Sequence, residues 1–308
     1  MLEILFAGTG ASIPSRHRSL PCIAIKQGRS VSLFDCGEGS QRQLMLSHFS
    51  FMRIDRIFIT HMHGDHMLGL PGLLQTMGMS GRTEKVSVFG PAGIRDSLTR
   101  MMEACEGDLE FELEITEAEA GDCFQFNGFS VSVYDTIHGC SSVGYLYRED
   151  MRPGEFNKDK AQSLGLDPSD YSKLQKGETV KGVRSNQVIG RPRPGCSVAY
   201  PGDTIVCDSV REAVRGVDVL IHEGTYMEQD SGLAHEHNHS TVAQVAKMAS
   251  DCNVRSLMLV HISNRYGGAE EPLAEAKMYF ESTVAPNDLD IYSVSPGTIK
   301  LLSEGPPS

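Results

Sequence analysis

The sequence lacks any apolar run as long as the roughly 20 residues that a membrane-spanning helix needs. Its first residues, MLEILFAGTG, also lack the positively charged region of a secretory signal peptide. None of the eight cysteines forms a CxxC pair, and their scatter through 308 residues excludes a dense disulfide framework. We therefore expect a soluble, cytoplasmic protein with no membrane partner, whose cysteines are reduced and mostly in the core.

Positive charge is also scarce, because 28 Lys and Arg residues face 40 Asp and Glu residues, for a net charge of -12. Phosphate recognition depends largely on clustered Lys and Arg, so this balance argues against indiscriminate polyanion binding. The segment from Arg152 to Pro194 is the exception, with nine basic and five acidic residues. It is net positive in a chain that is otherwise strongly acidic.

What the sequence does have is the composition of a globular protein, with 40% hydrophobic and 22% charged residues, enough for one large or two small domains. Short runs rich in Val, Ile and Phe alternate with glycine-bearing turns and helical patterns. Strands are expected at Leu2–Ala7, Ile23–Lys26, Val31–Phe34, Ile57–Thr60, Val86–Phe89, Phe111–Ile115, Phe124–Phe126, Ser130–Tyr134, Val143–Tyr147, Ser197–Tyr200, Val217–Ile221, Leu257–Val260, Ile291–Val294 and Ile299–Leu301. Helices are expected at Ser40–Ser47, Leu68–Met77, Ala92–Ala104, Ser209–Arg215, Thr241–Ser250 and Leu273–Phe280. This pattern predicts an α/β protein with two strand-rich halves.

The segment from Met151 to Gly195 breaks this pattern. It contains few apolar residues and is far longer than the roughly 12 to 15 residues that a structureless loop usually reaches in a compact domain. It is therefore either a functional projection or a disordered insert. Helical stretches at Lys158–Leu164 and Asp170–Lys176 favour a folded projection.

The densest group of ligand-type side chains is HMHGDH, at residues 61–66. It begins where the apolar run IFIT ends, at the kind of strand end where α/β proteins place their chemistry. His61 and His63 are two residues apart on an extended segment and so project from the same side, while Asp65 and His66 follow the turn at Gly64 and can face a second ion. Imidazole suits zinc, and carboxylates complete such sites.

Six residues cannot close two metal shells, so further ligands must come from elsewhere. His138 follows SVSVYDTI, Asp203 lies in AYPGDT, and His261 follows SLMLV, so that each comes directly after an apolar run. A carboxylate such as Asp203 can bridge two cations. The remaining ligands would be His61, His63 and His138 on one ion, and Asp65, His66 and His261 on the other. We predict two Zn²⁺ per chain, with Mn²⁺ or another divalent metal as the alternative, because a metal pair about 3.5–4 Å apart activates water and assists phosphoryl displacement.

A candidate general acid stands in AHEHNHST, at His239, directly before the helix TVAQVAKMA. A hydrolase that expels an alkoxide needs a proton donor on the leaving-group side, and histidine titrates in the right range. Glu223, at the end of the strand VDVLI, could hold the other imidazole nitrogen and favour the protonated form. Asp65 is expected to take the proton from the attacking water.

These motifs together resemble the metallo-β-lactamase superfamily, through FDCGEGSQ, HMHGDH and the later His138, Asp203 and His261. The resemblance narrows to tRNase Z, also called ribonuclease Z, a family of tRNA 3′-end endonucleases. The narrower likeness comes from GTGASIPSRHRS near the start, HEGT at 222–225, HST at 239–241 and HISNRY at 261–266. It extends over essentially the whole chain.

The resemblance implies an αβ/βα sandwich with two zinc ions that cuts precursor tRNA after the discriminator base and leaves a 3′-hydroxyl. It implies one metallo-β-lactamase-like domain over residues 1–308, in which 151–195 is an inserted flexible arm, an exosite that grips the tRNA elbow, and it implies a homodimer. Asp35 matches a superfamily motif and is expected to support the metal ligands. Substrate contacts are expected from the loop residues Arg16 and Arg18 and from the arm residues Lys158, Lys160, Lys173 and Lys176.

Two other functions are compatible with the sequence. One is a superfamily relative that hydrolyses small phosphodiesters or esters, with the arm as a lid or a dimer contact. The other is a non-catalytic RNA-binding protein that kept the fold, and the complete ligand set together with His239 and Glu223 argues against it.

Overall fold

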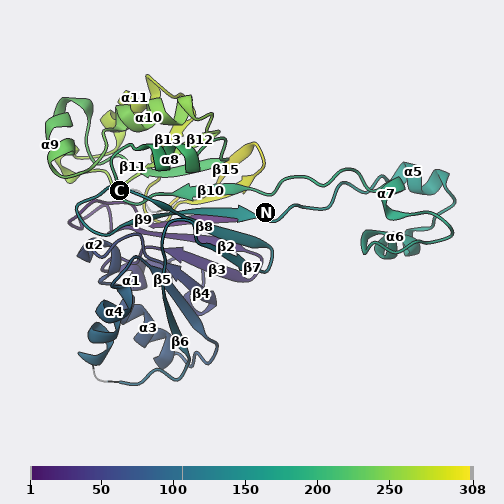
Figure 1. Cartoon of the computed structure of the whole chain (residues 1–308), viewed down its shortest axis with the longest axis horizontal. Helices are drawn as coiled ribbons and strands as arrows, with labels where there is room; N and C mark the ends of the chain where they lie inside the picture. The colour runs from purple at the N-terminus through teal and green to yellow at the C-terminus, as the bar shows by residue number, and fades with distance from the viewer. Residues whose placement is uncertain (1, 106, 306–308) are drawn as a thin grey trace. The chain divides into compact units, whose positions relative to one another are not determined.

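The computed structural model describes residues 2–105 and 107–305 and forms two compact units. The main unit comprises residues 1–126, 130–148 and 196–308, and the arm unit comprises residues 127–129 and 149–195. The arm unit contains the net-positive segment for which the sequence predicts a projection. Figure 1 shows the course of the chain, coloured from its N-terminus to its C-terminus.

The first sheet of the main unit has eight strands in the order β15-β14-β1-β2-β3-β4-β5-β6. Neighbouring strands are antiparallel from β15 to β3 and parallel from β3 to β6. Their bounds are β1 Leu2–Gly8, β2 Cys22–Gln27, β3 Ser30–Phe34, β4 Ile54–Phe58, β5 Val86–Gly90, β6 Leu113–Glu117, β14 Ile291–Ser295 and β15 Thr298–Ser303.

The second sheet has seven strands in the order β13-β12-β11-β10-β9-β8-β7. The strands from β13 to β10 are parallel, and β10 and β9 are antiparallel. Their bounds are β7 Cys123–Phe126, β8 Phe129–Asp135, β9 Val143–Glu149, β10 Ser197–Tyr200, β11 Val219–Glu223, β12 Ser256–Val260 and β13 Thr283–Val284.

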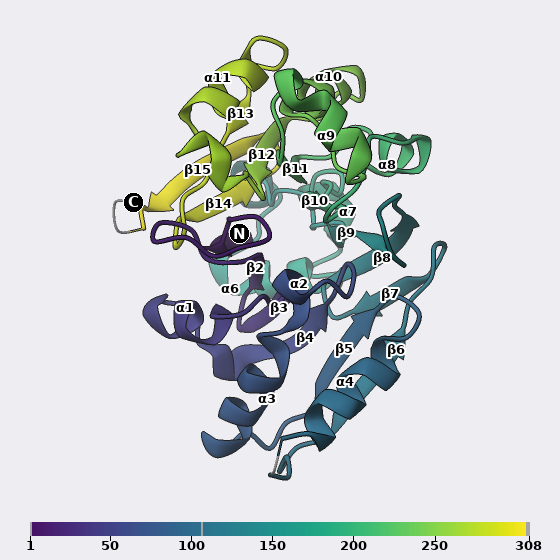
Figure 2. The ribbon, with the colours of Figure 1, turned by 90° about the vertical axis from the view of Figure 1, so that its left-hand side faces the viewer.

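Helices cover the outer faces of both sheets, which gives the main unit an αβ/βα layering (Figure 2). Helices α1, α3 and α4 pack on the first sheet, and α8, α10 and α11 pack on the second. The helices of the main unit are α1 Ser40–Leu46, α2 Gly64–Met67, α3 Leu70–Met79, α4 Ile94–Glu103, α8 Asp208–Ala213, α9 Ser231–Glu236, α10 Val242–Asp251 and α11 Glu270–Lys277. Short 3₁₀ turns lie at Phe51–Arg53, Glu228–Asp230 and Asn264–Tyr266.

The layering follows from the alternation of side chains along each strand. Leu33 of β3 packs in the cluster beneath the outer helices, whereas the next residue, Phe34, stacks on Phe58 of β4 with ring centroids 5.1 Å apart. Phe34 also meets Tyr145 and Tyr200 of the second sheet, at centroid distances of 6.1 and 6.2 Å. The two sheets therefore pack on each other through aromatic rings.

The arm unit has a small apolar core of its own. Three helices lie in it, and its buried residues are Ala161, Leu166, Leu174, Val183 and Val188. The helices are α5 Lys158–Ser163, α6 Pro168–Gln175 and α7 Ser185–Val188. The side chain of Asn157 accepts a hydrogen bond from the amide of Lys160, and Asp167 begins α6 with a capping box. The two helices predicted in this segment are thus confirmed.

Most predicted elements lie where the sequence places them, with ends that differ by a few residues. Strand β4 ends two residues before its predicted end at Thr60, because the Thr60 amide donates to the Asp35 carboxylate (2.8 Å) instead of joining the ladder. Strand β11 continues to Glu223, two residues beyond its predicted end, because it stays paired with β12 as far as Val260. The sequence missed α2, α7, α9 and β13, which are short elements that only tertiary contacts stabilise.

No helix within residues 2–105 and 107–305 is long and apolar enough to cross a membrane. No disulfide bond is present in that part of the chain. Four of the eight cysteines are buried, two are half-buried and two are exposed, so the prediction that most lie in the core holds for half of them.

Candidate active site

The candidate ligands come together because they follow strands whose carboxyl ends lie at the same edge of the two sheets. The buried run of β4 leads into the segment 61–66, in which α2 begins at Gly64. Three further strands, β8, β10 and β12, are each followed within a few residues by a candidate ligand, namely His138, Asp203 and His261.

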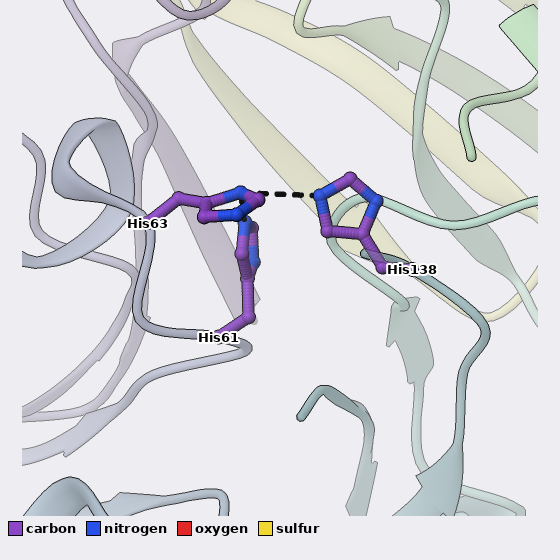
Figure 3. A group of neighbouring side chains, drawn as sticks. All are labelled: His61, His63 and His138. Atoms are coloured by element: carbon purple, nitrogen blue, oxygen red, sulfur yellow. Dashed lines mark hydrogen bonds between the residues drawn. The ribbon is translucent and has the colours of Figure 1, made fainter. Parts of the chain in front are cut away.

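Three imidazole rings form the first group, and Figure 3 shows them facing one another. Nε2 of His61 lies 3.1 Å from Nδ1 of His63, and Nε2 of His138 lies 3.2 Å from the same Nδ1. His61 is fully buried, and burial together with the neighbouring His66 lowers its pKa well below the usual value. His61 is therefore neutral, which is the form that binds a metal.

The spacing of these three nitrogens fits a metal better than it fits hydrogen bonds. One Nδ1 atom cannot be the hydrogen-bond partner of two other ring nitrogens at once in an ordinary tautomer. A tetrahedral zinc ion with Zn–N distances of about 2.0–2.1 Å holds its nitrogen ligands about 3.3 Å apart, close to the 3.1 and 3.2 Å separations observed. The first group thus has the donor atoms and the spacing of a metal shell.

The second group contains two imidazoles and two carboxylates: Asp65, His66, Asp203 and His261. Oδ2 of Asp203 lies 3.3 Å from Nε2 of His66 and 3.2 Å from Nε2 of His261. Oδ2 of Asp65 lies 3.5 and 3.3 Å from the same two nitrogens. Nε2 of His66 is buried and has no hydrogen-bond partner among the described residues, as expected of a ligand nitrogen reserved for a cation.

Asp203 lies between the two groups. Its Oδ2 atom is 3.9 Å from Nε2 of His61 in the first group and within 3.3 Å of both histidines in the second. The structure therefore places all seven predicted ligands in one continuous cluster, with a carboxylate at the position of a bridge. These residues fit a two-metal centre in number, donor type and spacing.

Asp35 holds one ligand of the second group from behind. Its side chain is fully buried, and Oδ2 accepts a hydrogen bond from Nδ1 of His66 (2.8 Å) and from the hydroxyl of Tyr200 (2.8 Å). Its other oxygen accepts the amide of Thr60 (2.8 Å). Because Nδ1 of His66 donates its hydrogen to the carboxylate, the neutral ring presents its lone pair at Nε2, where a metal can bind.

Neighbouring polar atoms, two oxygens and one backbone amide, orient three other candidate ligands. Nδ1 of His261 lies 2.8 Å from Oγ1 of Thr225, and Nδ1 of His138 lies 3.0 Å from the carbonyl oxygen of Asn238. Oδ2 of Asp65 accepts the amide of Ser12 (3.0 Å). Each of these contacts leaves the opposite nitrogen, or the remaining lone pairs of the carboxylate, turned into the cluster.

Glu223 and His239 form a buried ion pair beside the ligands. Nδ1 of His239 lies 2.9 and 3.0 Å from the two carboxylate oxygens, one of which also accepts the amide of Thr204 (2.8 Å). Burial alone would lower the pKa of His239, but the adjacent Glu223 carboxylate outweighs it and raises the pKa to about 9. Burial likewise raises the pKa of Glu223, and the charge of His239 more than offsets this, so that pKa lies below its usual value. His239 is therefore protonated at neutral pH in this arrangement.

Comparisons with known proteins agree with this geometry. The family model described as "Anti-Pycsar protein Apyc1" matches residues 2–151, and the model described as "Beta-lactamase superfamily domain" matches residues 176–262. The chain is 41% identical over 295 residues to ribonuclease Z of Methanosarcina acetivorans, and the match covers 94% of this chain and 97% of that protein.

The chain belongs to the ribonuclease Z family. It is 38% identical over 298 residues to ribonuclease Z of Bacillus subtilis, with 93% of this chain and 97% of that protein covered. The crystal structure of the short form of human tRNase Z superimposes with a TM-score of 0.70 at 27% identity, covering 95% of this chain and 99% of the human one. The predicted family and the metallo-β-lactamase fold are thus confirmed, and the chain is a metal-binding endonuclease of tRNA processing.

The two loop arginines predicted to bind substrate lie in different environments. Arg16 is exposed between β1 and β2. Arg18 is only 8% exposed, and its guanidinium donates to Oγ1 of Thr9 and to the carbonyl oxygen of Pro286 (3.0 Å). The Arg18 head group therefore holds the loop against the segment before β14, and a contact between Arg18 and the substrate stays a prediction.

The four arm lysines with a predicted substrate role are Lys158, Lys160, Lys173 and Lys176. All four are exposed on or beside α5 and α6. No ion pair engages their ammonium groups within the described part of the chain, whereas the nearby Lys181 pairs with Asp167 and Asp170 at 2.7 and 2.9 Å. Their charges are thus available to a polyanion.

The sequence predicted a supporting role for Asp35, which contacts His66, but it missed the other residues that orient the candidate ligands. Thr225 stands within the HEGT motif, so that motif contained a usable signal for the partner of His261. Asn238 and Ser12 act through a backbone carbonyl and a backbone amide, which every residue type offers. Only the fold reveals these two contacts.

Proposed function

We propose that the chain removes the 3′ trailer of precursor tRNA by hydrolysing one phosphodiester bond with two bound divalent ions. The observation that carries this proposal is the convergence of seven ligand side chains beside the Glu223–His239 pair. Five imidazoles and two carboxylates make zinc the favoured ion, with Mn²⁺ as the alternative. The ligands proposed for one ion are His61, His63 and His138, and those for the other are Asp65, His66 and His261, with Asp203 shared.

The side chains would divide the proton transfers of the hydrolysis between them. Bound divalent ions supply Lewis-acid charge that stabilises the phosphoryl transition state. The Asp65 carboxylate accepts the proton of the attacking water, and protonated His239 donates a proton to the departing O3′. The P–O3′ bond breaks as a P–O bond to water forms, so the tRNA keeps a 3′-hydroxyl and the trailer leaves with a 5′-phosphate.

The contacts of His239 support its role as the acid. Its Nδ1 atom is held by Glu223, so Nε2 is the atom that can donate to a substrate. The carboxylate fixes the ring orientation and stabilises the imidazolium, as the third member of a catalytic triad does. The ligand atoms of His239, His138 and Asp203 all lie within 4.8 Å of one another, which supports a position for His239 beside the reacting phosphate.

For the arm, the proposed role is an exosite that binds tRNA away from the scissile bond. The exposed ammonium groups of Lys158, Lys160, Lys173 and Lys176 support it, because phosphate contacts from Lys supply most of the affinity for nucleic acids. Residues 151–195 would then be an inserted, flexible part of one metallo-β-lactamase-like domain. A cytoplasmic homodimer is part of the same proposal, and light scattering of the purified protein tests the dimer.

A precursor tRNA transcript with a 3′ extension tests the function directly. The expected result is one cut directly after the discriminator base, with a 3′-hydroxyl on the tRNA product. The variant Asp65→Asn should give no cut. Hydrolysis of a small chromogenic phosphodiester with no cleavage of the transcript would instead favour the alternative hydrolase, and absence of both activities would favour an RNA-binding protein.

A further inference from the structure

A cavity of about 380 Å³ borders His239, and none of the seven candidate metal ligands is among the described residues that line it. It is enclosed by the loop after β10 and by helices α8, α9 and α10, which contribute Ile205, Val206, Arg211, Ala234, His235 and Lys247. Its volume lies within the range of pockets that hold small organic groups. Nothing in the metal centre or in the proton transfers accounts for this cavity.

The charge of the lining favours an anionic occupant. Arg211 and Lys247 line the cavity and no carboxylate does, in a chain whose net charge is -12. Lys247 lines the cavity, and its ammonium lies 4.3 Å from the centre of the Tyr279 ring. Within the described residues, the guanidinium of Arg211 makes a long, exposed ion pair with Asp251 (3.6 Å), which a phosphate can replace.

The other part of the lining is apolar. Ile205 and Val206 are half-buried and Ala234 is buried, so one wall can accept the face of a nucleobase. A pocket with an apolar wall and one cation at its rim matches the chemistry of a nucleotide, in which a flat base is joined to a phosphate.

The position of His239 indicates which nucleotide of the substrate would occupy the cavity. A general acid must lie within hydrogen-bond reach of the oxygen that leaves, and in the proposed reaction that oxygen is O3′ of the last nucleotide of the mature tRNA. We propose that the cavity receives this nucleotide, with its base against Ile205 and Val206 and the phosphate on its 5′ side at Arg211. This inference rests on the proposed function and names the substrate group that sits beside His239.

A pair of charge-matched variants tests the phosphate contact. Arg211→Gln removes the cation at the cavity, whereas Arg215→Gln removes an exposed arginine four residues later that does not line it. We expect Arg211→Gln to raise KM for precursor tRNA roughly 10- to 100-fold, which corresponds to the loss of one charged hydrogen bond. It should also reduce the salt slope of binding by about one, and Arg215→Gln should change neither. Equal KM values and salt slopes for the two variants would overturn the proposal.

A steric variant tests occupancy of the cavity itself. Ser231 is exposed and lines the cavity at the first residue of α9, so Ser231→Trp fills the space without disturbing the core. We expect kcat/KM for precursor tRNA to fall at least 10-fold, with hydrolysis of bis(p-nitrophenyl) phosphate and the thermal midpoint unchanged. Unchanged cleavage of precursor tRNA by Ser231→Trp rejects the nucleotide pocket.

The experiments distinguish an error in the proposed function from an error in the assignment of the cavity. If the wild-type protein does not cut precursor tRNA, the proposed function itself is wrong. If the wild type cuts it and the Arg211 and Ser231 variants cut it equally well, only the assignment of the cavity is wrong. A precursor whose last tRNA nucleotide is abasic adds a direct readout. The wild type should cleave it more slowly than the normal precursor, and Ser231→Trp should cleave it at the same rate as the wild type does.

Discussion

His239 and five of the seven candidate ligands around it are histidines, and their expected roles differ through what each ring nitrogen contacts. In His66 and His261 a neighbouring oxygen accepts a hydrogen bond from Nδ1–H, so that Nε2 of the neutral ring presents a lone pair to a cation. In His239 a full carboxylate charge from Glu223 keeps the ring protonated. We therefore expect the same residue type to act as a ligand or as an acid according to the charge of its partner.

Replacement of His239 separates these two roles. We expect His239→Ala to keep both metals and to lose roughly 10²- to 10⁴-fold in turnover, the usual contribution of a general acid. The loss should be much smaller for a nitrophenyl phosphodiester, because nitrophenolate leaves without a proton. Metal analysis and single-turnover rates on both substrates provide the test, and loss of one metal from the variant would identify His239 as a ligand.

The Glu223 carboxylate should set the alkaline limb of the pH profile. His239 must be protonated to act as the acid, and its pKa is raised to about 9 mainly because Glu223 favours the charged ring against the effect of burial. Activity should therefore persist through neutral pH and fall as the pH rises through the pKa of His239. In Glu223→Gln the limb should move to lower pH, while the amide oxygen can still accept the amide of Thr204. Rates between pH 6 and 10 measure the shift, and an unmoved limb would show that the pair does not control the acid.

At the scale of elements, the loop between β1 and β2 illustrates how the fold supports the site. Asp288, just before β14, accepts the amides of Thr9 (3.0 Å) and Ser19 (2.6 Å) and so holds both ends of this loop. Arg18 ties the same loop to the carbonyl of Pro286. The loop in turn supplies the amide of Ser12 that contacts the predicted ligand Asp65. A loop far from the metal ligands in sequence thereby helps to orient one of them.

A comparison of variants at Arg18 and Arg16 tests whether Arg18 stabilises the loop between β1 and β2. Arg18→Ala leaves buried acceptors unpaired and should lower the free energy of unfolding by about 2–4 kcal/mol. Arg16→Ala removes an exposed side chain and should leave stability within about 0.5 kcal/mol of the wild type. Urea unfolding of the two metal-free variants measures both values. If the two variants are equally stable and only precursor tRNA affinity falls in Arg18→Ala, the arginine contacts the substrate instead.

The arm is an element whose removal should separate binding from chemistry. All seven proposed ligands lie outside residues 153–193, which belong to the arm unit with its own apolar core. Replacement of this segment by a short Gly/Ser linker should leave metal content and hydrolysis of a small phosphodiester near the wild-type level. It should strongly weaken binding of precursor tRNA and flatten the dependence of affinity on salt, because fewer counterions are released. Equal affinity and equal salt slope with and without the segment would reject the exosite.

At the scale of the whole molecule, the metal centre joins parts of the chain that are far apart in sequence. His61 follows a strand of the first sheet, whereas Asp203 and His261 follow strands of the second. Between the two sheets, Oδ2 of Asp203 lies 3.9 Å from Nε2 of His61, and Oδ2 of Asp65 lies 3.3 Å from Nε2 of His261. Metal binding should therefore contribute to the stability of the pairing of the two sheets as well as to catalysis.

Metal removal tests the centre at this scale. The purified protein should contain close to two divalent ions per chain, and chelation should abolish hydrolysis and lower the thermal midpoint. Added Zn²⁺ or Mn²⁺ should restore both. Elemental analysis that finds one ion or none in a fully active preparation would contradict the two-metal proposal.

By itself, the sequence determined the type of chemistry and the position of most regular elements. The motif from His61 to His66 puts four ligand-type side chains directly after a buried strand, and this local spacing predicts a metal site without any knowledge of the fold. The hydrophobic runs likewise predict most strands to within a few residues, because alternation and burial are local properties of a strand.

The tertiary structure decided what surrounds those residues. Arg16 and Arg18 are equivalent in the sequence, yet one is exposed and the other is buried against Thr9 and Pro286. The carbonyl oxygen of Asn238 and the cavity beside His239 also arise only when distant helices meet. Backbone atoms carry no residue-specific signal, and burial depends on which segments pack together, so neither can be deduced from local spacing.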